Sequence, residues 1–292
     1  MTYEELEKKR IKLRNTYIIY YTLLITIVIT ITLLSKIAGF IIFGIALGIL
    51  LIPSITKKQV KEYSLAFKDF FVKKSLTKIF TNLCYEPEKG IPKSLISSTG
   101  MMYMGDRYSS NDLVTGNYKD IRFTQSDVSI EKKETYRDGD GKTQTAYITI
   151  FEGRWMIFDF NKNFKRKVQV CQKGFKNNKI NNFQKVEMES QEFNKNFKVY
   201  ARQPIDAFYI LTPKIMEKIR NLDKKNKGEL LLCFTNNQLH VGINEYKDSF
   251  EPKNVFFKID EEKINNAIST DIKKITMFID ELELNNDLFK RD

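Results

Sequence analysis

The chain has 292 residues, of which 42% are hydrophobic and 29% are charged, as in a folded protein with one large core or two small ones. Its net charge of +12 is unevenly placed, because residues 1–83 hold 13 basic and only 5 acidic side chains. Positive charge around an apolar segment is typical of a chain held at an anionic membrane face. No nucleic-acid-binding motif accompanies the charge, so we expect no nucleic acid as a partner.

The cysteines Cys84, Cys171 and Cys233 are far apart and form no CxxC pair, and His240 is the single histidine. These spacings argue against a disulfide framework and against a zinc site. Reduced thiols fit a cytoplasmic domain. The sequence therefore predicts no metal and no cofactor.

Two apolar runs, residues 17–34 and residues 37–52, flank the polar pair Ser35 and Lys36. As helices they would be about 27 and 24 Å long, close to the ~30 Å hydrocarbon core of a bilayer. One continuous helix would instead place Lys36 in mid-bilayer, which costs about 2.5 kcal/mol or more. We therefore predict a two-helix transmembrane hairpin over residues 17–52 that turns at Ser35 and Lys36.

Basic side chains flank this hairpin on one side of the membrane. They precede the first span and follow the second, whereas Lys36 is alone at the turn. The positive-inside rule then predicts a two-span protein of the cell inner (plasma) membrane with both termini cytoplasmic. A cleaved signal peptide is disfavoured, because no small-residue cleavage site follows Leu34 and a second apolar run begins at once. The flanking basic residues are Lys8, Lys9, Arg10, Lys12, Arg14, Lys57, Lys58 and Lys61.

The two spans carry small and hydroxyl residues that bear on how they pack. Gly44 and Gly48 form a GxxxG pair, and Thr22, Thr26 and Thr30 recur along one face of the first span. Three interpretations are open. The glycines could receive the threonine face within the hairpin, the threonines could bond to their own helix carbonyls, or the glycines could form a homodimer contact.

Helices are predicted on both sides of the hairpin. Thr2 and Glu5 have the spacing of a capping box, which predicts a short basic helix over residues 1–16. Residues 53–83 are predicted to form a membrane-proximal amphipathic helix. Its aromatic face would rest on the membrane interface or the hairpin base and its aliphatic face on the next domain, unless protein buries both. The aromatic face holds Val60, Tyr63, Phe67, Phe70 and Phe71, and the aliphatic face holds Leu65, Val72, Leu76, Ile79 and Leu83.

Residues 84–292 are predicted to form a single cytoplasmic α+β domain of antiparallel β-hairpins with a few helices. β-rich runs cover residues 120–136, 144–160 and 165–172. The sequence RDGDG, at residues 137–141, is rich in residues that tolerate positive φ and joins the first two runs as a hairpin turn.

Particular residues of these runs have predicted roles. Phe151, Trp155 and Ile157 alternate with other residues along the second run and are expected to lie in the core. Asp138 and Asp140 do not indicate a calcium loop, because the later carboxylate that such a loop needs is missing. A hairpin turn is therefore the interpretation we keep for that segment.

Helices and a further hairpin complete the predicted domain. A short helix is expected within residues 92–100, and a capped amphipathic helix over residues 212–228. Residues 229–244 are predicted to form a hairpin that turns at residues 236–237. A helix over residues 269–284 closes the chain. The inward residues of this last helix are Ile272, Ile275, Phe278 and Ile279.

No motif for a nucleotide-binding loop, a metalloprotease or an activated nucleophile occurs, so we assign no catalytic, cofactor-binding or metal-binding residue. His240 has no paired carboxylate or cysteine in the sequence and is expected to be structural. Two polar groups that follow β runs could line a site or cap turns. They are Asp159, Asn161, Lys162 and Asn163, and Tyr200, Arg202 and Asp206.

Four stretches carry a family resemblance: "DLVTGNYKDIRFTQSDV", "FEGRWMIFDFNKNFKRKVQV", "EFNKNFKVYARQPIDAFYILTPKIMEKI" and "LHVGINEYKDSFEP". They cover most of residues 112–252, and FDFNK and the YxLTP-like piece are the most specific. Together they resemble an uncharacterised family of bacterial membrane proteins, domain of unknown function 3137. The resemblance implies an N-terminal pair of membrane spans before a cytoplasmic domain. It transfers no catalytic residue and suggests a LemA-type membrane protein as a partner.

The sequence favours a membrane-anchored cytoplasmic binding or scaffolding module that recruits a protein partner or engages the anionic inner leaflet. Its spans lack the intramembrane charges that a transporter needs. The alternative is a membrane-bound enzyme whose site no motif reveals. Asp159 and Arg202 distinguish the two, because an enzyme site built on them requires both side chains in one deep pocket.

Overall fold

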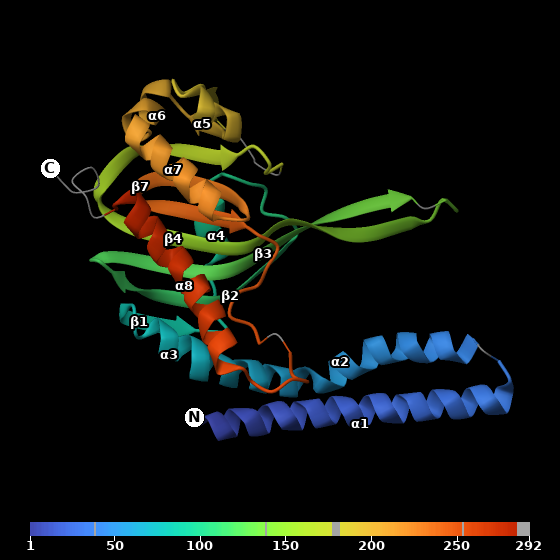
Figure 1. Ribbon diagram of the computed structural model, residues 1–292. Helices are drawn as coiled ribbons and strands as arrows, with labels where there is room; N and C mark the ends of the chain where they lie inside the picture. Colours follow the sequence, from blue (N-terminus) through green and yellow to red (C-terminus); the bar gives the residue numbers. More distant parts are fainter. Residues whose placement is uncertain (38, 138, 177–181, 253, 285–292) are drawn as a thin grey trace. The chain divides into compact units, whose positions relative to one another are not determined.

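Figure 1 shows the computed structural model, which describes residues 1–37, 39–137, 139–176, 182–252 and 254–284, with only the backbone at residues 161–166. The chain divides into two compact units, which we describe separately. The helical unit comprises Met1–Ser75 and Phe250–Ile268, and the sheet unit comprises Leu76–Ser249 and Ser269–Asp292.

The helical unit is built on two long helices, α1 (Tyr3–Ser35) and α2 (Gly39–Phe67), which lie side by side in Figure 1. The predicted capping box is confirmed, since Thr2 Oγ1 accepts from the Glu5 backbone and Glu5 Oε2 accepts from the Thr2 backbone. α1 joins the basic segment and the first apolar run in one continuous helix. Lys36, at φ 59°, ends it where the hairpin turn was predicted.

Both long helices are long and apolar enough to cross a membrane, judged by length and composition. Their apolar side chains are largely unburied, and Leu34 and Ile42 are 81% and 75% exposed. In water, each Å² of such surface costs about 25 cal/mol relative to an apolar environment. The exposed apolar surface therefore needs a covering that these two helices do not give each other.

The segment predicted as one helix over residues 53–83 is divided differently. α2 continues through Pro53 and is followed by a π-helix at Lys68–Lys73 and a short α3 at Lys74–Leu76, and Thr81–Glu86 is strand β1. The prediction of a helix to residue 83 is therefore wrong at its end, because pairing with a neighbouring strand outweighs helix propensity there. The aromatic residues Tyr63, Phe67 and Phe71 are buried in protein rather than exposed to a membrane surface.

Within the described residues, the sheet unit contains seven antiparallel strands. They are β1 (Thr81–Glu86), β2 (Arg107–Tyr118), β3 (Ile121–Arg137), β4 (Thr143–Gln172), β5 (Gln184–Val186), β6 (Phe197–Ala201) and β7 (Glu229–Asn244). Their order is β1-β2-β3-β4-β6-β5, with β7 also paired to β4. One edge of β4 contacts β3 along its first half and β6 along its second half, while β7 follows the other edge. The predicted α+β class with an antiparallel sheet is confirmed.

Helices cover the sheet or join its strands. They are α4 (Lys93–Ser97), α5 (Gln191–Asn196), α6 (Pro204–Ile210), α7 (Pro213–Lys225) and α8 (Glu261–Leu282), the last of which begins in the helical unit. α7 starts at the predicted N-cap, where Thr212 Oγ1 accepts from the Ile215 backbone. α7 and α8 lie across one face of the sheet (Figure 1), and the rings of Phe158 on β4 and Phe278 on α8 stack with centroids 6.2 Å apart.

The hairpin predicted within residues 229–244 is not formed. These residues make the single strand β7, which pairs with β4 from Gly153↔Asn244 to Cys171↔Leu231. Asn236 does adopt a positive φ of 49°, but it lies at an irregularity in the register and not in a reversing turn. The reason is tertiary. β4 is 30 residues long and pairs with β7 from one end of β7 to the other, so the backbone groups of β7 are hydrogen-bonded without a hairpin.

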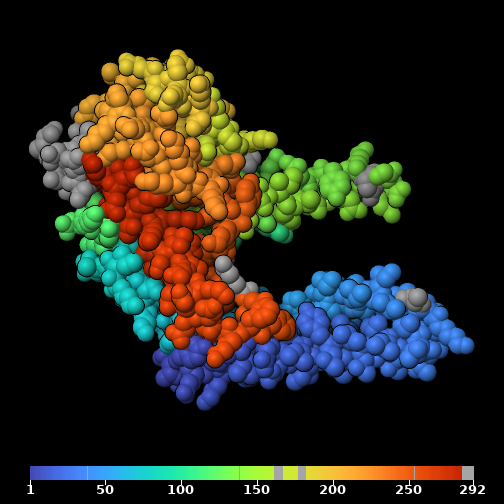
Figure 2. Space-filling model, viewed as in Figure 1, coloured from blue at the N-terminus to red at the C-terminus, as the bar shows by residue number. Residues whose placement is uncertain are grey.

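The hairpin predicted around RDGDG is confirmed, with the turn residue Asp138 outside the described residues. β3 and β4 extend beyond the other strands as a two-stranded arm, in which residues 132–137 pair with residues 143–148. Figure 2 shows this arm in green, standing clear of the rest of the sheet unit. Most side chains of the arm are exposed, including Tyr136 and Ile148.

The predicted core residues Phe151, Trp155 and Ile157 are buried together. Gly242 on β7 is placed against this group, because a Cβ built there would lie 2.7 Å from Trp155 Cζ3. Any larger residue would have to move the indole ring, so a glycine is required where β7 passes Trp155.

Candidate functional site

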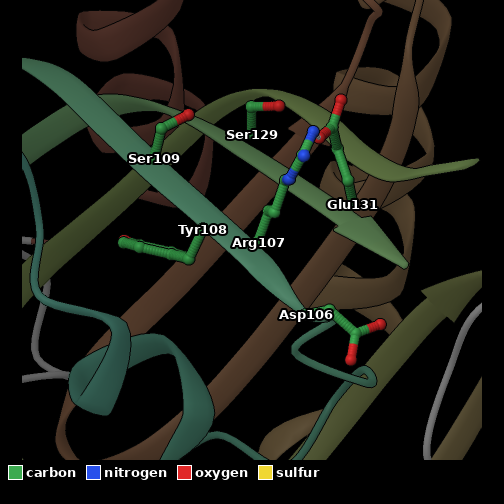
Figure 3. Close-up of a pocket in the computed structure, with 6 residues that line it drawn as sticks. All are labelled: Asp106, Arg107, Tyr108, Ser109, Ser129 and Glu131. Carbon is green, nitrogen blue, oxygen red and sulfur yellow. Dashed lines mark ion pairs between the residues drawn. The ribbon is translucent and has the colours of Figure 1, made fainter. Parts of the chain in front are cut away.

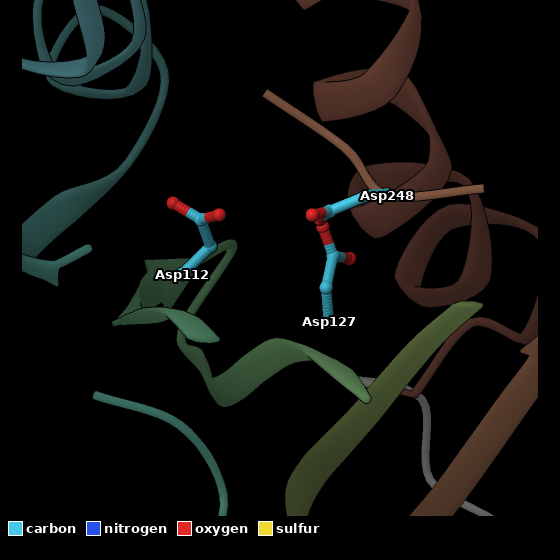
Figure 4. Close-up of side chains that lie close together, drawn as sticks. All are labelled: Asp112, Asp127 and Asp248. Atoms are coloured by element: carbon cyan, nitrogen blue, oxygen red, sulfur yellow. The ribbon is translucent and has the colours of Figure 1, made fainter. Parts of the chain in front are cut away.

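Three carboxyl groups meet in the sheet unit although they are distant in sequence. Asp112, Asp127 and Asp248 bring carboxylate oxygens within 4.8 Å of one another, and Figure 4 shows the Asp127 and Asp248 groups pointing toward each other. Asp112 and Asp127 are buried and Asp248 is exposed. Asp112 lies in the register irregularity of β2, which brings it beside Asp127 of β3. We call these three residues the acidic cluster.

Neutral donors hold the two buried carboxylates in place. The Tyr85 hydroxyl donates to Asp112 Oδ1, and Asn111 Nδ2 donates to Asp112 Oδ2 at 2.9 Å. The Ser249 backbone donates to Asp127 Oδ2 at 2.6 Å. These contacts fix the orientation of both carboxyl groups.

A buried arginine lies beside the acidic cluster. Arg154 on β4 faces Asp127 across the sheet, is 0% exposed, and has its Nε 4.0 Å from Asp127 Oδ1. Its Nη2 is 3.5 Å from Asp271 Oδ1 of α8, and its guanidinium also donates to the Asp271 carbonyl and the Ser249 hydroxyl. This single side chain therefore ties β3, α8 and the segment at Ser249 together.

Asp127 has an unusual proton affinity. Burial raises the pKa of Asp127 well above its ordinary value, the neighbouring Asp248 raises it further, and Arg154 lowers it. Among the described residues, the buried side chain of Gln125, two positions earlier on β3, has no hydrogen-bond partner for either amide atom. Carboxylate and amide oxygens are ligands for hard cations such as Ca²⁺ or Mg²⁺. The acidic cluster can thus share a proton or hold such a cation.

The polar residues singled out from the sequence lie elsewhere. Asp159 accepts from Gln238 Nε2 at 2.8 Å, and its Oδ2 is 4.0 Å from Arg122 Nε. The side chains of Asn161, Lys162 and Asn163 fall outside the described residues. Asp159 is therefore bonded across the sheet surface rather than grouped with other titratable residues in a described cavity.

The second predicted group is also dispersed. Tyr200 is buried, Asp206 is half-buried, and Arg202 is exposed directly after β6. β6 pairs with β4 through Val168↔Ala201, so Arg202 follows the position opposite Val168. Asp159 and Val168 pair with Gln238 and Phe234 of β7, which are four residues apart, so roughly 13 Å separates the two positions along the sheet. The structure does not bring Asp159 and Arg202 into one pocket.

His240 and two of the thiols are buried. Trp155 Nε1 lies 3.4 Å from His240 Nδ1 and donates to it, and burial, with a smaller contribution from Lys167, lowers the pKa of His240 to about 4. Burial raises the pKa of both Cys171 and Cys233 to about 12, which leaves them protonated and unreactive at neutral pH. His240, Cys171 and Cys233 are therefore assigned to the packed interior of the sheet unit and not to a reactive site.

The glycines of α2 contact α1 of the same chain. A Cβ built on Gly44 would lie 2.1 Å from Val28 Cγ2, and one built on Gly48 would lie 2.4 Å from Leu24 Cδ2. Both glycines therefore allow the helix backbones to approach closely within the hairpin, as small residues do in membrane helices. Their partners are aliphatic, so the interpretation in which they receive the threonine face is wrong.

The threonines of α1 bond to their own helix. Thr26 Oγ1 donates to the Thr22 carbonyl and Thr30 Oγ1 to the Thr26 carbonyl, each at 2.9 Å. Local back-bonding of this kind satisfies a hydroxyl without an interhelical partner. A homodimer through Gly44 and Gly48 stays a prediction, and it would have to use a face that α1 already covers.

A shallow groove of about 490 Å³ lies at the base of the arm (Figure 3). Arg107 Nη1 is 3.6 Å from Glu131 Oε2, and the Arg107 guanidinium carbon is 3.2 Å from the centre of the Tyr147 ring. Asp106 Oδ2 accepts from the Lys133 backbone at 2.7 Å. Each charged group named here has a partner, so the groove has no uncompensated charge to attract an ionic ligand.

Sequence reasoning missed the acidic cluster because its members come from three separate segments. No spacing rule links residues 112, 127 and 248. The one local signal is Asp127 itself, because the residues on either side of it in β3 are buried. A carboxylate in a buried strand segment needs a hydrogen-bond or charge partner.

Comparisons with known proteins found a family match and a similar solved structure. Residues 149–284 match the family described as "Protein of unknown function (DUF3137)". No curated protein matches the chain. Among solved structures, the crystal structure of the mycobacterial trehalose monomycolate transport factor A, TtfA, is similar at 12% identity and a TM-score of 0.41, covering 76% of this chain and 94% of that chain. The family resemblance predicted from the sequence is therefore confirmed over residues 149–284.

Proposed function

We propose that the protein is a membrane-anchored binding module, with α1 and α2 crossing the inner membrane and the sheet unit on the cytoplasmic side. The observation that carries this proposal is the exposed apolar surface of both helices, which a bilayer would cover. Basic residues at the ends of the two apolar runs distant from the turn support the orientation, because positive charge is retained on the cytoplasmic side and attracted to anionic lipid.

The binding role is supported by the β3–β4 arm. In the described registers its residues 132–137 pair with residues 143–148 and with no third strand. A two-stranded ribbon is marginally stable alone, and its edges can accept a further strand from a partner. The arm is therefore the surface on which we expect a protein partner, such as the LemA-type membrane protein that the family resemblance suggests.

An enzyme is the second candidate, and the acidic cluster is the observation in its favour. A buried carboxyl group with a raised pKa next to another carboxyl group is a recurrent arrangement for proton transfer. Against it, Asp159 and Arg202 are separated, and the described groove at the arm base is shallow. The binding module is the function we favour.

Cysteine labelling tests the anchoring and its direction. Cys84 is an exposed thiol of the sheet unit, and Ser35→Cys would add one at the hairpin turn. In spheroplasts, a membrane-impermeant maleimide should label the Ser35→Cys thiol in a Cys84→Ser background and should label Cys84 only after the membrane is permeabilised. Labelling of Cys84 in sealed spheroplasts, or release of the protein by alkaline extraction, would refute the proposal.

Shortening the arm tests the binding role. Lys133 and Tyr147 face each other, so residues 134–146 can be replaced by Asn-Gly, which closes a two-residue hairpin. We expect the shortened protein to stay in the membrane and to keep its Trp155 fluorescence, but to lose the partner that crosslinks to the wild type in native membranes. A matched Tyr136→Thr/Ile148→Thr variant keeps the strands and separates loss of side chains from loss of strand edges. Equal crosslinking by the shortened and wild-type proteins would exclude the arm as the docking surface.

A further inference from the structure

A cleft of about 430 Å³ lies within the helical unit, between α1, α2 and the chain that follows Phe250. Aromatic and aliphatic side chains make most of its wall: Leu13, Tyr17, Tyr21, Val60, Tyr63 and Phe256. The rings of Tyr17 and Phe256 have centroids 6.0 Å apart. Cavities of a few hundred Å³ with mainly apolar walls are typical of ligand-binding sites.

Polar contacts hold the segment that contains Glu251 and Val255 against α1 and α2. Arg10 Nη1 donates to the Val255 carbonyl at 2.6 Å, and Glu251 accepts from the Ser64 hydroxyl at 2.9 Å. Glu251 also forms an ion pair with Lys68, whose side chain is buried. Arg10, Glu251 and Lys68 are thus paired within the protein. Burial raises the pKa of Tyr63 to about 12, so its phenol is neutral. The interior therefore suits an uncharged, apolar occupant.

The position of the cleft along the helices suggests the source of that occupant. Tyr17 begins the first apolar run, and Pro53 directly follows the second, so the cleft spans the boundary between the apolar and basic segments. Leu13, Tyr17 and Tyr21 recur every four residues, and the same helical stripe continues to Ile25, which is 56% exposed. Apolar and aromatic side chains at this spacing therefore lead from the cleft toward the part of α1 that would face lipid.

We propose that this cleft binds one acyl chain of an anionic phospholipid from the inner leaflet, with the phosphate beside the basic residues at the cytoplasmic end of α2. Lys57 lies one turn from both Pro53 and Val60 and is exposed, so it is placed to meet that phosphate. Tyrosines at the interface are suited to the same depth, since their rings are amphipathic. The proposal rests on the membrane anchoring proposed above.

The test uses the full chain in nanodiscs that contain phosphatidylglycerol with a photoactivatable diazirine in the acyl chain. We expect crosslinks to concentrate in residues 13–21, 53–63 and 254–256. Val60→Trp, which fills the cleft, should reduce these crosslinks at least about fivefold, the factor that corresponds to a loss of ~1 kcal/mol of binding. Tyr21→Trp is a second filling variant in case the first does not fold, and Ile49→Trp, on an exposed surface of α2, is the matched control that should leave them unchanged.

Three outcomes would overturn the inference. Crosslinks could spread evenly along the exposed apolar residues of α1 and α2, the Val60→Trp and Ile49→Trp proteins could behave alike, or cleft residues could crosslink to a second copy of the chain. Replacing the probe by a phosphatidylcholine with the same acyl chain tests the headgroup preference. Equal labelling by the two lipids would refute the proposed selectivity for an anionic headgroup and the role of Lys57 in it. Failure of the anchoring is distinguishable, because the protein would then not remain in nanodiscs at all.

Discussion

Replacing Arg154 by methionine is expected to lower the free energy of unfolding by about 3–5 kcal/mol, the cost of breaking a buried ion pair by removing one partner. The variant would leave the buried carboxylates of Asp127 and Asp271 without the cation that both approach. It would also remove the donors to the Asp271 carbonyl and the Ser249 hydroxyl. Chemical denaturation of the purified full chain in detergent, followed by the fluorescence of Trp155, measures the change.

Two further variants make this prediction specific. Adding Asp127→Asn to Arg154→Met should recover part of the loss, because the double variant no longer buries an uncompensated carboxylate at position 127. Lys119→Met removes an exposed ion pair with Asp280 and should change the stability by less than about 1 kcal/mol. A loss below ~1 kcal/mol for Arg154→Met would show that water reaches the cluster and screens its charges.

Acidification from pH 6.5 to 4 is expected to destabilise the wild type relative to a His240→Gln variant. The unfolded chain binds a proton at position 240 below about pH 6.5, whereas burial keeps His240 neutral in the folded protein down to about pH 4. The unfolded state binds more protons in this window, so stability falls as the pH falls. A difference of about 2.5 pKa units corresponds to at most ~3.4 kcal/mol.

The comparison between the two proteins isolates the histidine. Asp127 acts in the opposite direction, because its raised pKa lets the folded state take up a proton first, but this contribution is common to both proteins and cancels. Glutamine keeps an acceptor for the Trp155 ring nitrogen. Stability curves against pH, measured by circular dichroism, should therefore diverge below pH 6.5 and run parallel below pH 4. Curves that run parallel throughout would show that His240 is solvated in the folded state.

Features encoded by neighbouring residues were predictable from the sequence. The capping box at Thr2, the N-cap at Thr212 and the turn at residues 137–141 each depend on side chains within a few residues of the backbone they satisfy. The turn between the apolar runs was predictable for a similar reason, since Lys36, next to Ser35, is the only charged residue within residues 17–52. Alternation also identified Phe151, Trp155 and Ile157 as core residues.

Features that depend on distant partners were not predictable. Thr81–Glu86 became a strand because β2 lies beside it, and Glu229–Asn244 stayed extended because β4 accompanies it. The choice of Val28 and Leu24 as neighbours of the two glycines likewise depends on how α1 and α2 are rotated against each other. Local sequence fixes the spacing of residues along one element, but not its rotation or its neighbours.

The sequence by itself determined that this protein has two long apolar helices, a polar turn between them and an antiparallel α+β domain, because periodicity and capping act over a few residues. Only the tertiary structure decided that Asp112, Asp127 and Asp248 meet beside Arg154, and that residues 251–252 and 254–256 close a cleft against α1 and α2. The physical reason is that charge pairing and cavity formation depend on distances in space between segments that are separate along the chain.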